Sequence, residues 1–117
     1  MDDIQDKIIS IAEEQGWAIT IDEQNSSAVT FTFSKFTPQG QNFSFTAETF
    51  DNDPDVLLEN IFDYYQGYDP DYEAYLWIGE DGHGRNGAPF HIVDIVEDMK
   101  AAEDMVYQLH TALSNAF

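Results

Sequence analysis

The sequence predicts a single α+β domain that spans residues 1–117. Its elements follow the order helix, three strands, helix, a short strand or turn, and helix. Two observations support this order. Apolar residues recur at three-and-four spacing toward both ends of the chain, and between them apolar residues alternate with polar ones. We therefore expect a three-stranded antiparallel meander with the helices packed on one of its faces.

The first helix is predicted over residues 2–15. Ile4, Ile8 and Ile11 fall on one helical face, and Gly16 follows as a terminator. The spacing then changes to a period of two, which is typical of strands with one buried face. The three alternating runs cover residues 17–21, 29–34 and 43–48, with turns at 22–27 and 37–41.

Helical spacing returns at residues 54–66, where Asp53 is the expected N-cap and Pro54 the first helical residue. The segment 72–78 fits either a short strand or a helical turn. A glycine-rich loop follows at 79–87, and a long apolar stripe predicts the last helix at 92–114. On that helix we expect a set of acidic residues to face solvent: Asp94, Glu97, Asp98 and Asp104.

The charge of the chain restricts its partners. It has 23 acidic and 4 basic residues, for a formal net charge of −19. Such a field repels nucleic acid and anionic membranes and attracts basic proteins. The order of elements resembles the double-stranded-RNA-binding fold, but that fold binds phosphates through basic residues, which are nearly absent here. We therefore expect a basic protein as partner, with no direct nucleic-acid binding and no membrane association.

Several other functions have no support in the sequence. The chain has no Cys, which excludes disulfides, thiolate zinc sites and cysteine nucleophiles. Its acidic first residues do not resemble a signal peptide, so a cytoplasmic location is expected. No serine lies in a GxSxG motif and only 3 His are present. We expect a protein without enzymatic activity.

An acidic stripe runs along the second predicted helix. Asp55, Glu59 and Asp63 are spaced i, i+4 and i+8, and Asp51 lies just before the helix. Four residues of helix rise about 6 Å, on the scale of phosphate spacing along a nucleic-acid strand. The stripe therefore fits a DNA mimic that occupies the basic cleft of a DNA-binding protein. It also fits an ordinary solvated face that serves solubility.

Aromatic residues cluster between Phe62 and Trp77, interleaved with carboxylates. Tyr and Trp are common anchors of protein interfaces, although the same rings could close one end of the core. The stripe and this cluster together give the predicted partner-binding residues: Asp51, Asp55, Glu59, Asp63, Tyr64, Tyr68, Asp69, Asp71, Tyr72 and Glu73.

Residues 79–94 support an alternative interpretation as a metal-binding protein. Asp81, His83, His91 and Asp94 offer nitrogen and oxygen ligands, although their spacing matches no known site. Gly82, Gly84 and Gly87 also spell GxGxxG, which we interpret as coincidental because no dinucleotide-binding context surrounds it. A tight glycine-rich turn explains the same residues. No cofactor is expected beyond weak binding of divalent cations.

Six polar positions on one face of the predicted sheet are uncharged, on an otherwise densely charged protein. We name these positions the threonine face, which consists of Thr20, Thr30, Thr32, Ser34, Ser44 and Thr46. A partner or a second protomer could cover it, or threonine could simply suit strands. The sequence thus leaves monomer and homodimer open, and with them a structural oligomer whose acidity serves only solubility.

The stretch from Asp71 to Gly79 and the stretch from Asp81 to Pro89 resemble small uncharacterised acidic proteins carried on bacterial mobile elements. By its class, the chain is similar to anti-restriction and anti-CRISPR proteins that mimic DNA. That resemblance implies inhibition of a basic DNA-binding protein or nuclease. It assigns no individual residue to a site.

Overall fold

Three antiparallel strands form one sheet in the order β1-β2-β3. They are β1 (Ala18–Glu23), β2 (Ala28–Phe36) and β3 (Asn42–Phe50). The computed structural model describes residues 3–23, 27–51, 53–85 and 88–117, so part of the predicted turn at 22–27 lies outside the described residues. Thr32 of β2 pairs with Thr20 on one side and with Thr46 on the other. The predicted meander is confirmed, and each strand extends slightly beyond its predicted end.

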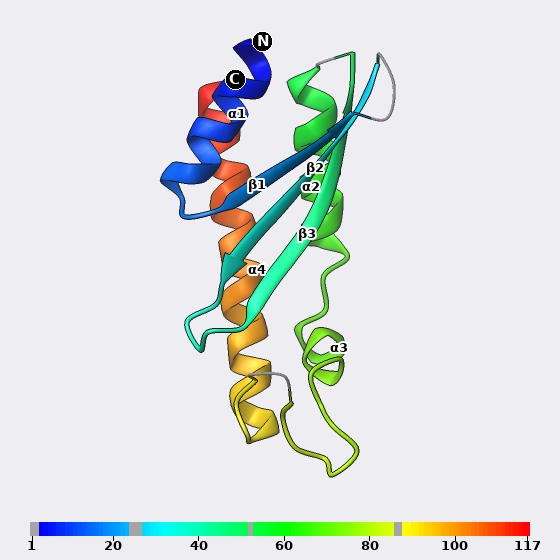
Figure 1. Cartoon of the computed structure of the whole chain (residues 1–117), viewed down its shortest axis with the longest axis vertical. Helices are drawn as coiled ribbons and strands as arrows, with labels where there is room; N and C mark the ends of the chain where they lie inside the picture. Colours follow the sequence, from blue (N-terminus) through cyan, green and yellow to red (C-terminus); the bar gives the residue numbers. More distant parts are fainter. Residues whose placement is uncertain (1–2, 24–26, 52, 86–87) are drawn as a thin grey trace.

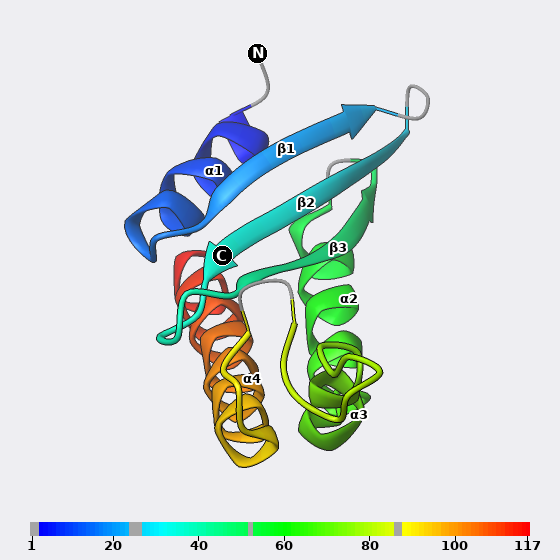
Figure 2. The same cartoon turned by 60° about the horizontal axis from the view of Figure 1, so that its bottom comes forward.

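Four helices accompany the sheet, namely α1 (Asp3–Glu14), α2 (Pro54–Gln66), α3 (Pro70–Tyr75) and α4 (Ile92–Ala116). Figures 1 and 2 show α1, α2 and α4 on the same face of the sheet, as the sequence predicts. The segment that the sequence left undecided begins within a short helix, α3. The end of the segment 72–78 is not helical: Ile78 forms an isolated β-bridge with Gly84.

Local sequence explains where the helices begin and end. Gly16 has a φ of +90°, and the amide of Trp17 donates to Ala12 at 3.0 Å, the pattern of a Schellman motif that closes α1. Asp53 caps α2 by accepting a hydrogen bond from the amide of Asp55 at 3.0 Å. Asp69 caps α3 in the same way. Both Asp-Pro-Asp runs are therefore helix starts.

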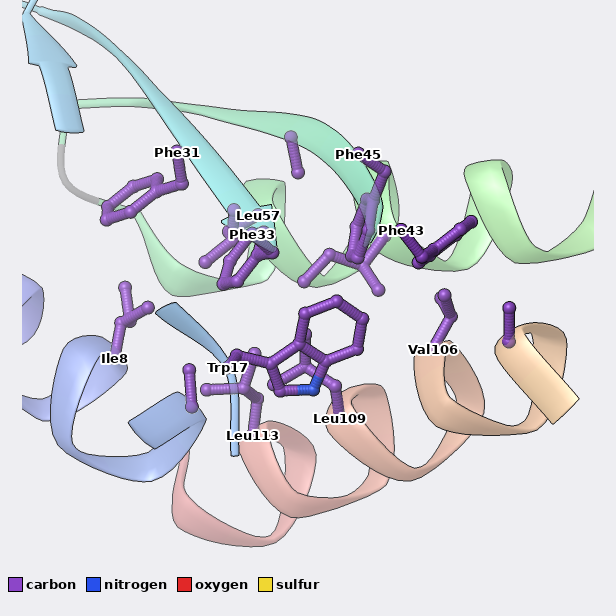
Figure 3. Close-up of a cluster of buried hydrophobic side chains, with 14 of the residues drawn as sticks. Ile8, Trp17, Phe31, Phe33, Phe43, Phe45, Leu57, Val106, Leu109 and Leu113 are labelled. Atoms are coloured by element: carbon purple, nitrogen blue, oxygen red, sulfur yellow. The ribbon is translucent and has the colours of Figure 1, made fainter. Parts of the chain in front are cut away.

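The main core lies between the sheet and the helices, with Trp17 at its centre (Figure 3). Its indole ring meets Phe33, Phe43 and Phe45 edge to face, at centroid distances of 6.3, 6.2 and 5.5 Å. Leu109 and Leu113 of α4 lie on the opposite side of the indole in Figure 3. Edge-to-face contacts of this kind stabilise a core beyond the burial of apolar area.

The beginning of α4 extends beyond the sheet and packs against α3. Ala74, Ile95 and Met99 form a second buried cluster there. Asp98 lies in the same part of α4, and its side chain is buried with 2% of its surface exposed. The prediction that Asp98 faces solvent is wrong, because its carboxylate accepts hydrogen bonds from the turn between β2 and β3.

The threonine face lies on the side of the sheet away from the helices. Thr20, Ser44 and Thr46 are exposed there, and the members of this face on β2 are partly exposed. In the described part of the chain, no helix is long and apolar enough to cross a membrane.

Candidate protein-binding surface

The acidic stripe is fully displayed on the surface of α2. Asp55, Glu59 and Asp63 are all exposed and lie on successive turns, as their spacing predicts. No Lys, Arg or His among the described residues forms an ion pair with any of them. The ion pairs among the described residues lie away from the stripe: His83 pairs with Asp81 at 3.9 Å, and Lys100 pairs with Glu97 at 3.5 Å.

Two of the few basic side chains are occupied elsewhere. Lys7 donates to the carbonyl oxygen of Ala116 at 2.7 Å, at the C-terminal end of α4. Lys35 donates to the carbonyl oxygen of Gln15 at 2.6 Å, beyond the end of α1. Both lysines thus stabilise helix ends, where the helix dipole favours a cation. The charge of the acidic stripe therefore remains available to a partner.

The stripe forms one wall of a groove between α2 and α4, which we name the α2–α4 groove. It is open to solvent, has a volume of about 500 Å³, and is lined by Asp55, Leu58, Glu59, Phe62, Asp63, His110 and Ser114. Leu58 and Phe62 supply apolar surface beside the carboxylates, and the Phe62 ring lies 5.3 Å from the His110 ring, centroid to centroid. Burial lowers the pKa of His110, which favours its neutral form. Apolar contact and negative charge therefore occur in the same groove.

Asp51 lies at the end of β3 and outside the groove lining. Its side chain is exposed, and its backbone has a φ of +55°. Its amide donates to the carbonyl oxygen of Ser27 at 2.7 Å, which continues the pairing of β3 with β2. Asp51 therefore precedes the stripe in the chain, as predicted, but does not line the same concave surface.

The structure divides the predicted tyrosines between core and surface. Tyr68 is buried, with 8% of its surface exposed, and its hydroxyl donates to the carbonyl oxygen of Met99 at 3.0 Å. Its assignment to the partner-binding surface is wrong, because its ring closes the core. Tyr64 is partly buried and stacks on Phe45 at a centroid distance of 4.8 Å. Burial raises the pKa of both phenols. Tyr72 is exposed, as an interface residue must be.

The remaining predicted acidic residues lie on and beside α3. Asp69 and Asp71 are exposed, and the Asp69 carboxylate is engaged as the cap of α3. Glu73 is partly buried, and burial, followed by the nearby Asp69 carboxylate, raises the pKa of Glu73. Glu73 lines a second hollow that shares no lining residue with the α2–α4 groove. The predicted partner-binding set is therefore divided: the acidic stripe lies in the α2–α4 groove, Glu73 lies in the second hollow, and Asp51 and Tyr68 belong to neither.

The four predicted metal ligands do not converge. His83 lies near Asp81 but stacks on Phe90 at a centroid distance of 4.0 Å. His91 is exposed, and its ring meets that of Phe90 edge to face at a centroid distance of 5.2 Å. Asp94 is exposed on the first turn of α4. Within the residues that the structure describes, no group of three or more His, Asp or Glu side chains could hold a metal ion.

The glycine-rich loop is tightly packed at Gly84. The amide of Gly84 donates to the carbonyl oxygen of Phe90 at 3.0 Å. A Cβ atom at this position would overlap the carbonyl oxygen of Pro89. This close approach explains Gly84 without a ligand and supports the interpretation as a tight turn. Gly87, the last glycine of the GxGxxG match, lies outside the described residues.

Comparisons of the chain with protein-family models, curated proteins and solved structures find no match. The resemblance to proteins of mobile elements and to DNA mimics therefore stays a prediction.

Sequence reasoning missed the groove and the residues that α4 contributes to it. Leu58 and Phe62 are spaced i, i+4 beside the acidic stripe, a pattern that could have revealed an apolar strip along the same helix. His110 and Ser114 could not have been assigned in this way. They reach the groove only because α4 packs against α2 in the folded protein.

Proposed function

We propose that the protein is a non-enzymatic binding module whose α2–α4 groove takes up a basic segment of another protein. The observation that carries this proposal is the combination of unpaired carboxylates and apolar surface in one groove. Long basic side chains suit such a surface, because their methylene stems cover apolar area while their charged ends reach carboxylates. An acidic face that served solubility alone would need no concave apolar floor.

A DNA mimic is the specific form of this function that we favour. The three stripe carboxylates project from successive helical turns, about 6 Å apart along the axis. A basic cleft that binds the phosphates of DNA could accept them in place of phosphates. The partner would then be a DNA-binding protein or nuclease, and duplex DNA would compete for it.

The groove also brings together Ser114, His110 and Asp63, which are the residue types of a hydrolytic triad. A nucleophilic serine requires a hydrogen-bonded base that a third group orients. In the described part of the chain, no hydrogen bond joins these three side chains. This geometry supports binding rather than catalysis.

Affinity capture from a bacterial lysate tests the proposal when three immobilised proteins are compared. These are the wild type, the stripe variant (Asp55→Asn, Glu59→Gln, Asp63→Asn) and a control variant on α1 (Asp6→Asn, Glu13→Gln, Glu14→Gln). The control residues are also exposed, and both variants lose the same number of charges. We expect a salt-sensitive partner on the wild type and the control, and its loss from the stripe variant.

Elution with duplex DNA distinguishes the DNA mimic from other basic partners. Release of the captured protein by DNA, followed by its identification as a DNA-binding protein, would support mimicry. If the stripe variant retains the same proteins as the wild type, the groove is not the binding surface.

A further inference from the structure

The outer edge of β3 displays backbone groups that pair with no other strand in the described part of the chain. β3 is a terminal strand of the sheet, as Figures 1 and 2 show. The amide of Asp51 donates toward β2, to Ser27 at 2.7 Å. The amide of Glu48 donates away from β2, to the side-chain oxygen of Asn60 at 3.4 Å. Backbone groups of successive residues in a strand point in opposite directions. The amides and carbonyls that point away from β2 therefore belong to the even-numbered residues of β3.

Among the described residues, this edge of β3 is protected at one end only. Asn60 of α2 covers it at Glu48, whereas the outward backbone groups of Asn42, Ser44 and Thr46 meet no such cover in the described residues. Natural sheets usually protect an edge with charged residues, proline or a bulge. Residues 42–46 contain no charge and no proline, and their pairing with β2 has no bulge.

A hollow of about 330 Å³ lies beside this unprotected stretch. It is lined by Asn42, Phe43 and Ser44 of β3 and by Glu73, Leu76 and Trp77 from α3 and the residues that follow it. Leu76 has 50% of its surface exposed, and Trp77 is partly exposed. Glu73 places a carboxylate at this apolar surface and forms no ion pair with any described residue. The hollow therefore fits a long side chain with an apolar stem and a positive end.

We propose that an extended segment of a partner protein adds to the sheet along Asn42–Thr46 and inserts a Lys or Arg side chain into the hollow beside Glu73. Main-chain hydrogen bonds to β3 would hold such a segment, and the hollow would select its side chain. The segment can be only a few residues long, because Asn60 closes the edge at Glu48.

The charge of the protein determines which occupant fits this edge. A second copy of the chain could pair edge to edge, but it would bring a further net charge of −19 against a strongly negative surface. A basic segment experiences attraction from the same field. This inference is independent of the α2–α4 groove, because the two surfaces share no lining residue.

A phage-displayed library of random heptapeptides, selected on the immobilised wild-type protein, tests the proposal. The matched variant is Ser44→Pro, because the Ser44 amide faces outward and its loss removes no hydrogen bond to β2. We expect enriched peptides that carry Lys or Arg and bind Ser44→Pro at least about tenfold more weakly than the wild type. Glu73→Gln should weaken the same peptides by about tenfold.

Two further measurements keep the test independent of the folding of Ser44→Pro. Methylating the central backbone amides of a selected peptide should abolish its binding to the unchanged protein. Peptide binding should also slow amide hydrogen exchange at Ser44 and Thr46, while exchange at Glu48 stays unchanged. The stripe variant of the α2–α4 groove should bind the peptides as the wild type does.

Three outcomes would overturn the proposal. The first is a library without enrichment, and the second is a set of enriched peptides that bind Ser44→Pro as tightly as the wild type. The third is a wild-type dimer in sedimentation that Ser44→Pro dissociates, because the edge would then be filled by a second copy of the chain.

Discussion

Thr37 donates its hydroxyl hydrogen to the carboxylate of Asp98, which joins the turn between β2 and β3 to α4. The amide of Gln39 donates to the other oxygen of the same carboxylate at 3.1 Å. The carboxylate is buried, so these contacts replace its hydration. They fix the turn immediately before the stretch of β3 that borders the hollow.

Removing the Asp98 carboxylate should destabilise the protein strongly. We expect Asp98→Ala to lower the free energy of unfolding by about 2–3 kcal/mol, because it leaves the buried Thr37 hydroxyl and the Gln39 amide without their acceptor and opens a small cavity. Urea unfolding at pH 7 measures the change. The exposed Asp94, one turn earlier on α4, provides the control, and Asp94→Ala should have little effect. Equal effects of the two substitutions would contradict the role of the Thr37–Asp98 contact.

Gly84 should tolerate no side chain. We expect Gly84→Ala to cost at least about 1 kcal/mol of stability, because the new methyl group would overlap the Pro89 carbonyl and displace the loop. Thermal unfolding compares it with Gly67→Ala, whose added atom meets only the Asp63 carbonyl at 3.5 Å, an ordinary contact. A Gly84→Ala protein as stable as Gly67→Ala would show that the loop does not require this close approach.

Glu73 should make stability depend on pH. Burial, and after it the charge of Asp69, raises the pKa of Glu73 in the folded state above its ordinary value of 4.5. The folded state therefore binds this proton more tightly than the unfolded state does. The ionised carboxylate opposes folding above its folded pKa, and this cost disappears as the pH falls through that pKa toward 4.5.

Glu73→Gln removes the charge and is therefore expected to stabilise the protein at pH 7. The stability difference between the variant and the wild type should narrow when unfolding is measured at a pH close to 4.5, the ordinary pKa of Glu73. The other carboxylates are common to both proteins, so their titration cancels in the difference except at Asp69, whose charge interacts with that of Glu73. A constant difference at both pH values would contradict the raised pKa. The carboxylate of Glu73, which destabilises the folded protein, is also the one that the Lys or Arg of the proposed partner segment would neutralise.

The sheet and the long helices could be predicted because their signals are local. Alternation by two residues specifies which side of each strand is buried, and Asp53 with Pro54 marks the start of α2. The six-residue helix α3 was harder, because it is too short for its apolar spacing to identify it. Asp69 followed by Pro70 repeats the pattern of Asp53 and Pro54, and this repeat could have predicted the start of α3.

The site could be predicted only in part, because its geometry depends on contacts between distant residues. The acidic stripe follows from helical spacing alone, whereas His110 joins it only through the packing of α4 on α2. Asp98 and Tyr68 were predicted at the surface but are buried. Each looks like a surface residue by type, and each is buried by a partner far along the chain, Thr37 and Met99 respectively.

The acidic stripe should reduce the stability of the helix that carries it. Glu59 lies one turn from both Asp55 and Asp63, and like charges at this spacing cost about 0.2–0.5 kcal/mol per pair. Glu59→Gln removes both repulsions and leaves Asp55 in the first turn, where the helix dipole favours it. We therefore expect a gain of about 0.4–1 kcal/mol in the free energy of unfolding at low salt.

Salt provides the internal control for Glu59→Gln. At about 0.5 M NaCl the repulsions are screened, so the stability gain over the wild type should shrink. A gain that persists at high salt would indicate a packing effect instead. The same substitution should weaken binding of the basic partner captured through the α2–α4 groove. A variant that is more stable but binds less well is expected where a protein retains unfavourable charges for function.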